Sequence, residues 1–407
     1  MASRLLAPFA VRSFRFQWPA DLMTSWAFEM EALILGWYIL SATGSVQQLV
    51  TVAALAWLGS LFSPFFGLAG DRIGHRTLLC LTRCIYAMLA ACLAALTLGG
   101  KLQPWHVFTI ATLAGLVRPS DMVMRHALVG QTMAPGILLP AVAVSRTTAD
   151  TARIAGAFAG AGGVALIGMG PAYALVTAMY VVAFLLSLGV ARAPASAAPS
   201  AHPLADVKDA FVYVWRKPDL LGPFYLAFLV NLLAYPFVFG LLPYLAKEVY
   251  AVGQAGLGYL AASFWVGALA GSLLVGGGFR MRAARTMLWS GCVWFVAVVL
   301  FGQTTTFALG LALLFASGFV QSFCLSPLAA VMLRSSSEAM RGRVMGLRML
   351  AIWGLPLGLL AAGPLVATYG LPVTAFVYGG LGLAGTVAIA WRWRDALWRP
   401  SAAANAA

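Results

Sequence analysis

Residues 67–77 read GLAGDRIGHRT, a short charged stretch at the junction of two long apolar segments, 46–70 and 77–99. A helix needs about 20 mainly apolar residues to cross a bilayer, and each of the two segments provides that length. The same alternation of long apolar segments and short basic connections extends in both directions along the chain. The pattern predicts a membrane protein built of several spanning helices.

The composition indicates the same class of protein. Of the 407 residues, 62% are hydrophobic and only 9% are charged, whereas a soluble domain carries about 25% charged residues. So few charges cannot cover the surface of a water-soluble globule of this length. Soluble enzymes, disordered chains and disulfide-rich scaffolds are therefore excluded.

The sequence lacks the motifs that metal, cofactor and enzymatic chemistry require. The five cysteines lie inside apolar segments, and neither they nor the four histidines have the spacing of a metal site. No nucleotide-binding loop (GxxxxGKS/T), HExxH motif or nucleophile elbow (GxSxG) occurs. We expect no metal, no cofactor and no enzymatic activity.

Twelve apolar segments, separated by charged residues or Gly/Pro breaks, are expected to cross the membrane. They are 16–41, 46–70, 77–99, 104–127, 138–166, 171–191, 220–246, 254–279, 286–303, 306–333, 343–368 and 371–391. The net charge is +14. The basic residues of the connections lie mostly on one side of the membrane, and the connections on the other side hold only Lys101 and Lys247. Basic loops remain cytoplasmic, so both termini are expected in the cytoplasm. The expected partner is the lipid bilayer and not nucleic acid.

The middle of the chain has the composition of a linker. Residues 193–203 read APASAAPSAHP, which is rich in small residues and proline. Apolar residues then recur at helical spacing through 204–215, which predicts a short amphipathic helix on the cytoplasmic surface. We expect an N-terminal six-helix half at 1–192, a linker with this helix at 193–218, and a C-terminal six-helix half at 219–407.

The stretch 67–77 resembles the GxxxDRxG(R/K)R signature of the major facilitator superfamily of secondary transporters, and it joins the second and third spans, as that signature does. A weakened copy lies between the eighth and ninth spans, where Arg280 takes the place of Asp71. Members of this superfamily have two halves related by duplication. The resemblance implies an all-α membrane protein with the major facilitator fold, twelve helices in two pseudo-symmetric six-helix halves, which carries a small-molecule substrate by alternating access.

Further stretches resemble one bacterial branch of that superfamily, which includes the enterobactin exporter and macrolide efflux proteins. They are FRFQW at 14–18, ARIAG at 152–156, WRKP at 215–218 and MRGRVMG at 340–346. This resemblance implies a bacterial cytoplasmic (inner) membrane protein that exports a drug-like compound or a siderophore-like metabolite, and we expect a monomer. An importer or facilitator with the same fold is the alternative, because the charges do not encode the direction of transport.

Ionisable residues inside the predicted spans are concentrated in the first six. Charges within the hydrocarbon layer are costly, and they mark functional sites by default. We therefore predict proton coupling in this half, by Glu29, Asp21, Glu31, Arg118, Asp121, Asp150 and Arg153. In the alternative interpretation, pairs such as Asp121 with Arg125 and Asp150 with Arg146 are static and fix the register of the helices.

Glu29 and Glu31 are two residues apart on one helix, so they point in different directions. One is expected to face a cavity and the other a helix interface. Glu29 shares a helix face with Ser25, which favours Glu29 for the cavity.

The family resemblance also implies a conformational latch in the loop after the second span. Its residues would be Gly67, Asp71, Arg72, Gly74 and Arg76. Asp71 would lie near the start of the eleventh span, where the helix dipole favours an anion, and the latch would stabilise the outward-open state.

Substrate contacts are expected on the spans that line the cavity in this superfamily. The candidates are Trp26, Tyr225, Asn231, Tyr235, Gln321 and Trp353. Helix packing or contact with lipid is the alternative role of the aromatic residues.

Overall fold

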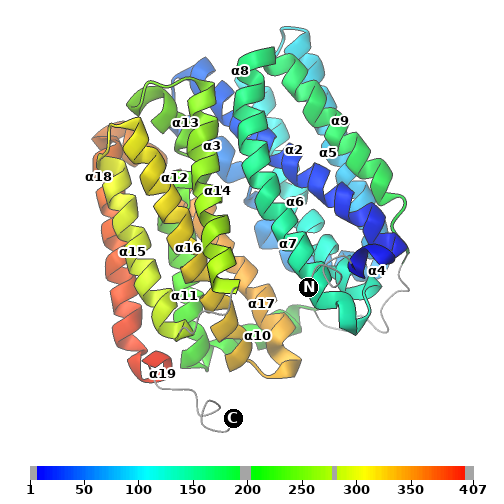
Figure 1. Ribbon diagram of the computed structural model, residues 1–407, viewed down its shortest axis with the longest axis vertical. Helices are drawn as coiled ribbons and strands as arrows, with labels where there is room; N and C mark the ends of the chain where they lie inside the picture. Colours follow the sequence, from blue (N-terminus) through cyan, green and yellow to red (C-terminus); the bar gives the residue numbers. More distant parts are fainter. Residues whose placement is uncertain (1–6, 193–202, 277–281, 399–407) are drawn as a thin grey trace. The chain divides into compact units, whose positions relative to one another are not determined.

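The computed structural model describes residues 7–192, 203–276 and 282–398, and within these ranges the chain is helical with no β-strand (Figure 1). The chain divides into two compact units. The first unit comprises Met1–Ala201 and Gly240–Trp265, and the second comprises His202–Phe239 and Val266–Ala407. The prediction of an all-α chain is confirmed.

The first unit contains the segments predicted as the first six spans. Its helices are η1 (Ala7–Ala10), α2 (Arg12–Thr43), α3 (Val46–Leu55), η2 (Leu58–Phe62), α4 (Ser63–Ile73), α5 (His75–Leu98), α6 (Pro104–Thr132), α7 (Pro135–Ala157), η3 (Phe158–Gly162), α8 (Gly163–Ile167), α9 (Met169–Ser187), α13 (Leu242–Tyr244), η4 (Leu245–Val249) and the first part of α14 (Gln254–Gly276). Four of them, α2, α5, α6 and α9, bury a common core that includes Met30, Leu93, Val107 and Tyr173.

The second unit contains the linker helix and the remaining long helices. They are α10 (Pro203–Trp215), α11 (Pro218–Leu233), α12 (Pro236–Phe239), the rest of α14, α15 (Ala283–Gln303), α16 (Phe307–Ser335), α17 (Glu338–Leu350), η5 (Ala351–Trp353), α18 (Gly354–Arg392) and α19 (Arg394–Trp398). Inside α18, Gly370 has φ 80° and ψ 167°. Glycine adopts this conformation at no steric cost, so the chain turns here, between the predicted eleventh and twelfth spans.

Within the described residues, eight stretches are long and apolar enough to cross a membrane. They are His75–Leu98, Pro104–Thr132, Met169–Ser187, Pro218–Val249, Gln254–Gly276, Ala283–Gln303, Phe307–Ser335 and Arg343–Arg392. The last of these stretches holds two predicted spans. The three predicted spans that are not among the eight stretches correspond to α2, the interrupted α3–η2–α4 and the interrupted α7–η3–α8. The count is four below twelve for three reasons. Arg343–Arg392 holds two predicted spans, acids lower the hydropathy of α2, and η2 and η3 break two others. The multi-pass character is confirmed.

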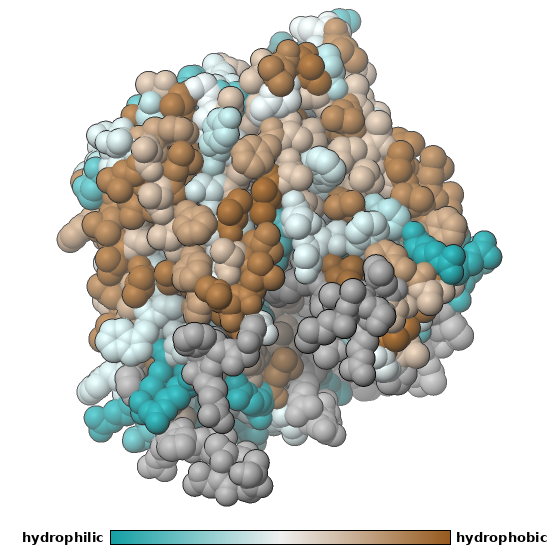
Figure 2. Space-filling model, viewed as in Figure 1, coloured by the Kyte–Doolittle hydropathy of each residue, from teal (hydrophilic) through white to brown (hydrophobic). Residues whose placement is uncertain are grey.

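The long helices expose large apolar side chains, among them Leu166, Leu273, Trp289 and Phe376. Figure 2 shows hydrophobic side chains along the lengths of the helices, while hydrophilic ones gather at the lower left, where α19 lies. An apolar surface of this extent is unsuited to water and is typical of a membrane-facing surface.

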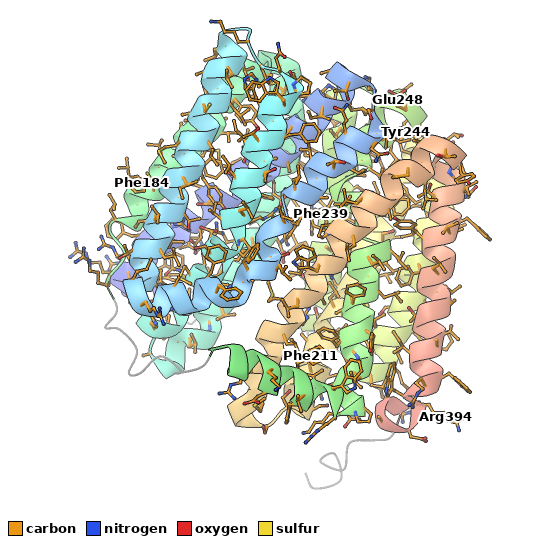
Figure 3. The ribbon with its side chains drawn as sticks, turned by 180° about the vertical axis from the view of Figure 1, so that it is seen from behind. Phe184, Phe211, Phe239, Tyr244, Glu248 and Arg394 are labelled. Carbon is orange, nitrogen blue, oxygen red and sulfur yellow. The ribbon has the colours of Figure 1, made fainter. Side chains whose placement is uncertain are left out.

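The linker helix α10 presents an exposed aromatic pair. Phe211 and Trp215 are 47% and 57% exposed, and their rings stack with centroids 5.5 Å apart (Figure 3 shows Phe211). On the same helix, the Tyr213 hydroxyl accepts the backbone N–H of Ser337, the residue that caps α17, at 3.0 Å. The linker helix is therefore attached to the start of α17 within the second unit.

Candidate functional site

Three ionisable side chains from α2 and α7 meet within the membrane-spanning part of the first unit. Arg153 Nε lies 3.5 Å from Glu29 Oε1, and Arg153 Nη1 lies 3.2 Å from Asp150 Oδ1. The guanidinium carbon of Arg153 is also 4.5 Å from the ring centroid of Trp265. We call Glu29, Asp150 and Arg153 the Glu29 cluster. With two carboxylates and one guanidinium, it carries one negative charge in excess when all three groups are ionised.

Two glycines on α7 and η3 allow this cluster to form. A Cβ atom at Gly156 would lie 2.7 Å from Glu29 Cβ, and one at Gly160 would lie 2.7 Å from Met30 Cα. Any larger residue would therefore force the two segments apart. Small residues are the usual means by which membrane helices approach closely, and here they bring Arg153 within reach of Glu29.

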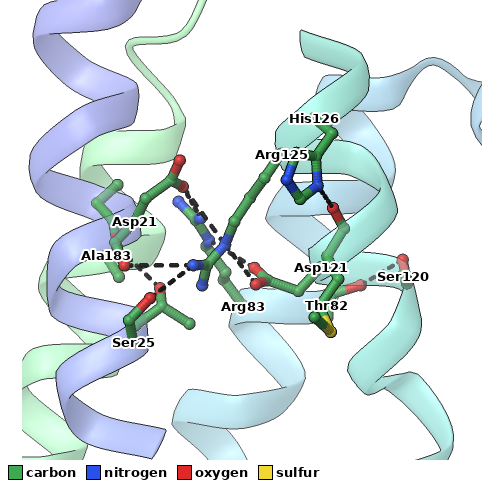
Figure 4. Close-up of polar contacts among 12 residues, drawn as sticks. Asp21, Ser25, Thr82, Arg83, Ser120, Asp121, Arg125, His126 and Ala183 are labelled. Atoms are coloured by element: carbon green, nitrogen blue, oxygen red, sulfur yellow. Dashed lines mark hydrogen bonds and ion pairs between the residues drawn. The ribbon is translucent and has the colours of Figure 1, made fainter. Parts of the chain in front are cut away.

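A second ionic cluster joins α2, α5 and α6 (Figure 4). The Arg83 side chain is fully buried, and its guanidinium contacts the carboxylates of Asp21 and Asp121, with Nε 3.1 Å from Asp121 Oδ1. Arg125 Nε lies 2.5 Å from Asp121 Oδ2 and 3.6 Å from Asp21 Oδ1. We call Asp21, Arg83, Asp121 and Arg125 the Asp21 cluster. Its two acids and two arginines balance.

Hydrogen bonds to neutral groups complete the Asp21 cluster. Arg83 Nη1 donates to Ser187 Oγ on α9 at 2.6 Å, and Arg125 Nη1 donates to Ser25 Oγ at 2.7 Å. Gln17 Nε2 donates to the carbonyl oxygen of Arg125 at 3.0 Å. The cluster therefore ties four helices together with its charges already satisfied.

Glu31 occupies a third environment. Its Oε2 accepts the hydroxyl of Tyr180 at 3.0 Å, and its Oε1 accepts that of Tyr173 at 3.5 Å. Both tyrosines belong to α9. Glu31 therefore faces α9, whereas Glu29 faces α7.

Arg118 on α6 has aromatic neighbours. Its guanidinium carbon lies 3.2 Å from the ring centroid of Phe28 and 3.8 Å from that of Trp57. Within the described part of the chain, no carboxylate lies at ion-pair distance from it, and its buried Nη1 has no hydrogen-bond partner. The seven predicted proton-coupling residues are thus distributed over the Glu29 cluster, the Asp21 cluster, Glu31 and Arg118.

Sequence reasoning omitted Arg83, which contacts both acids of the Asp21 cluster. The sequence feature that could have indicated a role for Arg83 is its charge inside the apolar segment 77–99. Its partners are distant in sequence, so no local spacing indicated that it joins Asp21 and Asp121. Arg146, which was considered as a partner of Asp150, has its side chain outside the described residues.

The predicted latch is described in part. Gly74, with φ 92°, ends α4 and precedes α5, and Arg76 donates to the carbonyl oxygen of Leu188 at the end of α9. Arg72 is exposed. The surroundings of Gly67 and of the Asp71 side chain lie outside the described residues, so the latch remains a prediction.

The family is decided by the sequence as a whole. The family model described as Major Facilitator Superfamily matches residues 18–347, which is most of the chain. The chain belongs to the Major Facilitator Superfamily. The match includes the stretch 67–77 and both ionic clusters. Membership makes the protein a membrane transporter of small molecules and not an enzyme.

Solved structures of other superfamily transporters share the fold. The nucleoside transporter NupG has 15% identity and a TM-score of 0.72, with 92% of this chain and 98% of that chain covered. The D-xylose-proton symporter has 12% identity and a TM-score of 0.74, with 93% and 97% covered. The POT family transporter PepTSo has 11% identity and a TM-score of 0.75, with 96% and 99% covered. No curated protein matches the sequence.

In this superfamily member, two of the predicted substrate residues contact each other in the second unit. Gln321 Nε2 donates to the hydroxyl of Tyr235 at 2.9 Å, and the Tyr235 ring packs edge-on against Trp294 with centroids 5.2 Å apart. Asn231 donates instead to the carbonyl oxygen of Ala227 on its own helix, at 2.8 Å.

The other predicted substrate residues have surroundings of their own. Tyr225 stacks on Trp393, which follows α18, with ring centroids 5.5 Å apart. Trp353 in the second unit and Trp26 in the first each have a buried indole nitrogen with no hydrogen-bond partner in the described part of the chain. Gln321 and Tyr235 thus form one contacting pair, and contact of any of the six residues with substrate remains a prediction.

Proposed function

We propose that this transporter is a proton-coupled exporter of a small amphiphilic organic molecule. The Glu29 cluster is the observation that carries the proposal. Among the described residues, one guanidinium lies at ion-pair distance from two carboxylates, so the two acids share a single partner in a medium where unpaired charges are costly. A proton on Glu29 or Asp150 removes that cost, which makes the cluster a proton carrier.

Arg153 supplies the means of releasing the proton. A carboxylate that lies close to an arginine favours its ionised form, and one that has lost the arginine favours its protonated form. A conformational change that moves Arg153 between Glu29 and Asp150 would therefore load and unload one proton per cycle. The Asp21 cluster is balanced without a proton, so we assign it a structural role.

The membrane potential supplies free energy for such coupling. At roughly 150 mV, moving one charge across the membrane releases about 3.5 kcal/mol, which supports a concentration ratio of a few hundred-fold for the substrate. The resemblance to the enterobactin exporter and macrolide efflux proteins supports export across the bacterial cytoplasmic membrane, and the basic connections on one side support cytoplasmic termini. The same resemblance supports a drug-like compound or a siderophore-like metabolite as the substrate, and we expect a monomer as the working unit.

The test uses inverted membrane vesicles that contain the full-length protein. Uptake of a macrolide (erythromycin) and of a catechol siderophore (enterobactin) is measured with and without a collapsed proton gradient. We expect uptake of at least one of them, lost on collapse of the gradient and lost in Glu29→Gln and Arg153→Ala at normal expression. Uptake that persists without the gradient would refute proton coupling, and uptake only into right-side-out vesicles would support import instead.

Glu248→Gln is the matched control. Glu248 is an exposed acid in the first unit and lies 3.9 Å from Lys247, outside both ionic clusters. The control loses one carboxylate just as Glu29→Gln does, and it is expected to transport normally. A loss of transport in the control would show that a change in total charge, and not the Glu29 cluster, causes the effect.

A further inference from the structure

Arg118 differs from Arg83, Arg125 and Arg153, the other arginines within the predicted spans of the first unit whose side chains the structure describes. Arg83, Arg125 and Arg153 each contact at least one carboxylate within 4 Å. Arg118 contacts none among the described residues, and its guanidinium instead meets two aromatic rings. A charge in the hydrocarbon layer normally has a partner of opposite sign.

The surrounding helices hold Arg118 in this position. A Cβ atom at Gly115, three residues before Arg118, would lie 2.0 Å from the carbonyl oxygen of Leu55, and one at Gly59 would lie 2.4 Å from that of Gly115. The two glycines thus let α6 contact the segment that joins α3 to η2. Trp57 lies in that segment, so the close contact places the Trp57 ring against the guanidinium.

The acids of the adjacent helix α2 are engaged elsewhere. Glu29 pairs with Arg153, and Glu31 accepts hydrogen bonds from Tyr173 and Tyr180. Neither is at ion-pair distance from Arg118. The Nη1 atom of Arg118 is buried and has no hydrogen-bond partner in the described part of the chain, while the residue as a whole is partly exposed. Arg118 therefore has a donor without an acceptor and, among the described residues, no carboxylate at ion-pair distance.

We propose that Arg118 binds the anionic group of the transported molecule. The two rings cover the guanidinium carbon, so the N–H groups at its edge are left to donate hydrogen bonds. That edge matches the two oxygens of a carboxylate, which arginine binds in bidentate fashion. Phe28 and Trp57 would contact the apolar part of the same molecule.

The proposal rests on the proposed transport function and narrows its substrate. Of the two classes considered above, an acidic siderophore-like metabolite fits an unpaired arginine, whereas a basic macrolide is repelled by it. The substrate would be an organic anion with an aromatic or apolar body. Both the charge and the flat apolar surface are then recognised by residues of the first unit.

The test measures binding to the purified full-length protein in detergent, with no gradient present. The probes are 1-naphthoate and the neutral 1-naphthamide, which have the same ring system. We expect saturable binding of 1-naphthoate to the wild type, at least tenfold weaker binding of 1-naphthamide, and at least tenfold weaker binding of 1-naphthoate to Arg118→Gln. Arg118→Lys, which retains the charge without the planar fork, should give an intermediate loss.

Arg392→Gln is the matched control, because Arg392 is an exposed arginine 5.9 Å from the Trp393 ring at the end of α18. It should bind 1-naphthoate as the wild type does. Absence of binding to the wild type, or equal binding of the two probes, or unchanged binding to Arg118→Gln would overturn the proposal. None of these results would bear on proton coupling, since the binding measurement uses no gradient. Conversely, vesicle uptake that does not depend on the proton gradient would refute proton coupling and leave the binding result unaffected.

Thermal unfolding of the same proteins separates binding from a structural role. An unpaired charge inside the protein does not stabilise it, so Arg118→Gln should unfold at or above the wild-type temperature when no probe is present. Saturating 1-naphthoate should raise the unfolding temperature of the wild type and not that of Arg118→Gln. If Arg118→Gln is much less stable than the wild type, and 1-naphthoate raises the unfolding temperature of both proteins equally, Arg118 is a structural residue.

Discussion

Arg83 and Arg118 show that two arginines at similar positions along membrane helices can have opposite surroundings. Arg83 is fully buried and contacts Asp21 and Asp121, whereas Arg118 contacts two aromatic rings and, among the described residues, has no carboxylate at ion-pair distance. Breaking a buried ion pair by removing one partner leaves an uncompensated charge and costs about 3–5 kcal/mol. The stability of the first unit should therefore depend on Arg83.

We expect Arg83→Met to lower the free energy of unfolding by about 3–5 kcal/mol, because Asp21 and Asp121 then share Arg125 as their one remaining cation in the Asp21 cluster. Thermal unfolding of the purified protein in detergent measures the change. Arg394→Met, which removes an exposed arginine at the start of α19, should change stability by less than about 0.5 kcal/mol. A stable Arg83→Met protein that has lost transport would instead assign the Asp21 cluster to the transport mechanism.

Among the elements, the contact between α2 and the α7–η3 segment depends on glycine. We expect Gly160→Ala to lower stability by about 1–3 kcal/mol, since its new Cβ would lie 2.7 Å from the backbone of Met30 and the helices must separate. Thermal unfolding measures this loss, and a transport assay should show a parallel decrease because Glu29 moves away from Arg153.

Gly162→Ala provides the comparison on the same short segment. A Cβ there would have no atom within 4 Å, and replacing glycine in a helix by alanine is worth about 0.5–1 kcal/mol. This variant should be as stable as the wild type or slightly more so. Equal destabilisation by the two substitutions would show that loss of backbone freedom, and not the contact with α2, determines the result.

The attachment of α10 to α17 is expected to depend on pH. The Lys217 ammonium donates to the Tyr213 hydroxyl at 2.8 Å, and this bond, with those to Ser337, lowers the pKa of Tyr213 to about 8. An unfolded tyrosine has a pKa of about 10. Between these two pKa values the unfolded state binds more protons than the folded state, so the free energy of unfolding rises with pH.

The contribution of Tyr213 to stability should therefore be complete above about pH 10 and lost as the pH falls through about 8. We expect the wild type to gain stability over Tyr213→Phe as the pH rises through this interval. Thermal unfolding at several pH values gives the difference, and the ultraviolet absorbance of the phenolate identifies the titrating group. A constant difference between the two proteins would contradict the lowered pKa.

For the molecule as a whole, the distribution of basic residues predicts its orientation in the membrane. In a variant with the native cysteines replaced, Lys101→Cys should react with a membrane-impermeant maleimide in intact cells, because the loop between α5 and α6 is expected outside. Asp395→Cys on α19 should react only after permeabilisation. The reverse labelling pattern would place both termini outside the cytoplasm.

The sequence by itself determined the class of protein, the positions of the apolar segments and the superfamily. These properties are local, because the free energy of inserting a helix is a sum over about 20 consecutive residues, and the stretch 67–77 is a contiguous motif. The predicted spans 46–70 and 138–166 are interrupted by η2 and η3, since backbone breaks depend on contacts with neighbouring helices. The turn at Gly370 falls between the predicted spans 343–368 and 371–391.

Only the tertiary structure decided which charges meet. Helical spacing placed Glu29 and Glu31 on different faces of α2 but did not reveal that one contacts Arg153 and the other contacts two tyrosines of α9. It also gave no reason to connect Arg83 with Asp21. Such pairings arise where helices distant in sequence pack together, and the glycines that permit close packing fix them, so no local pattern encodes them.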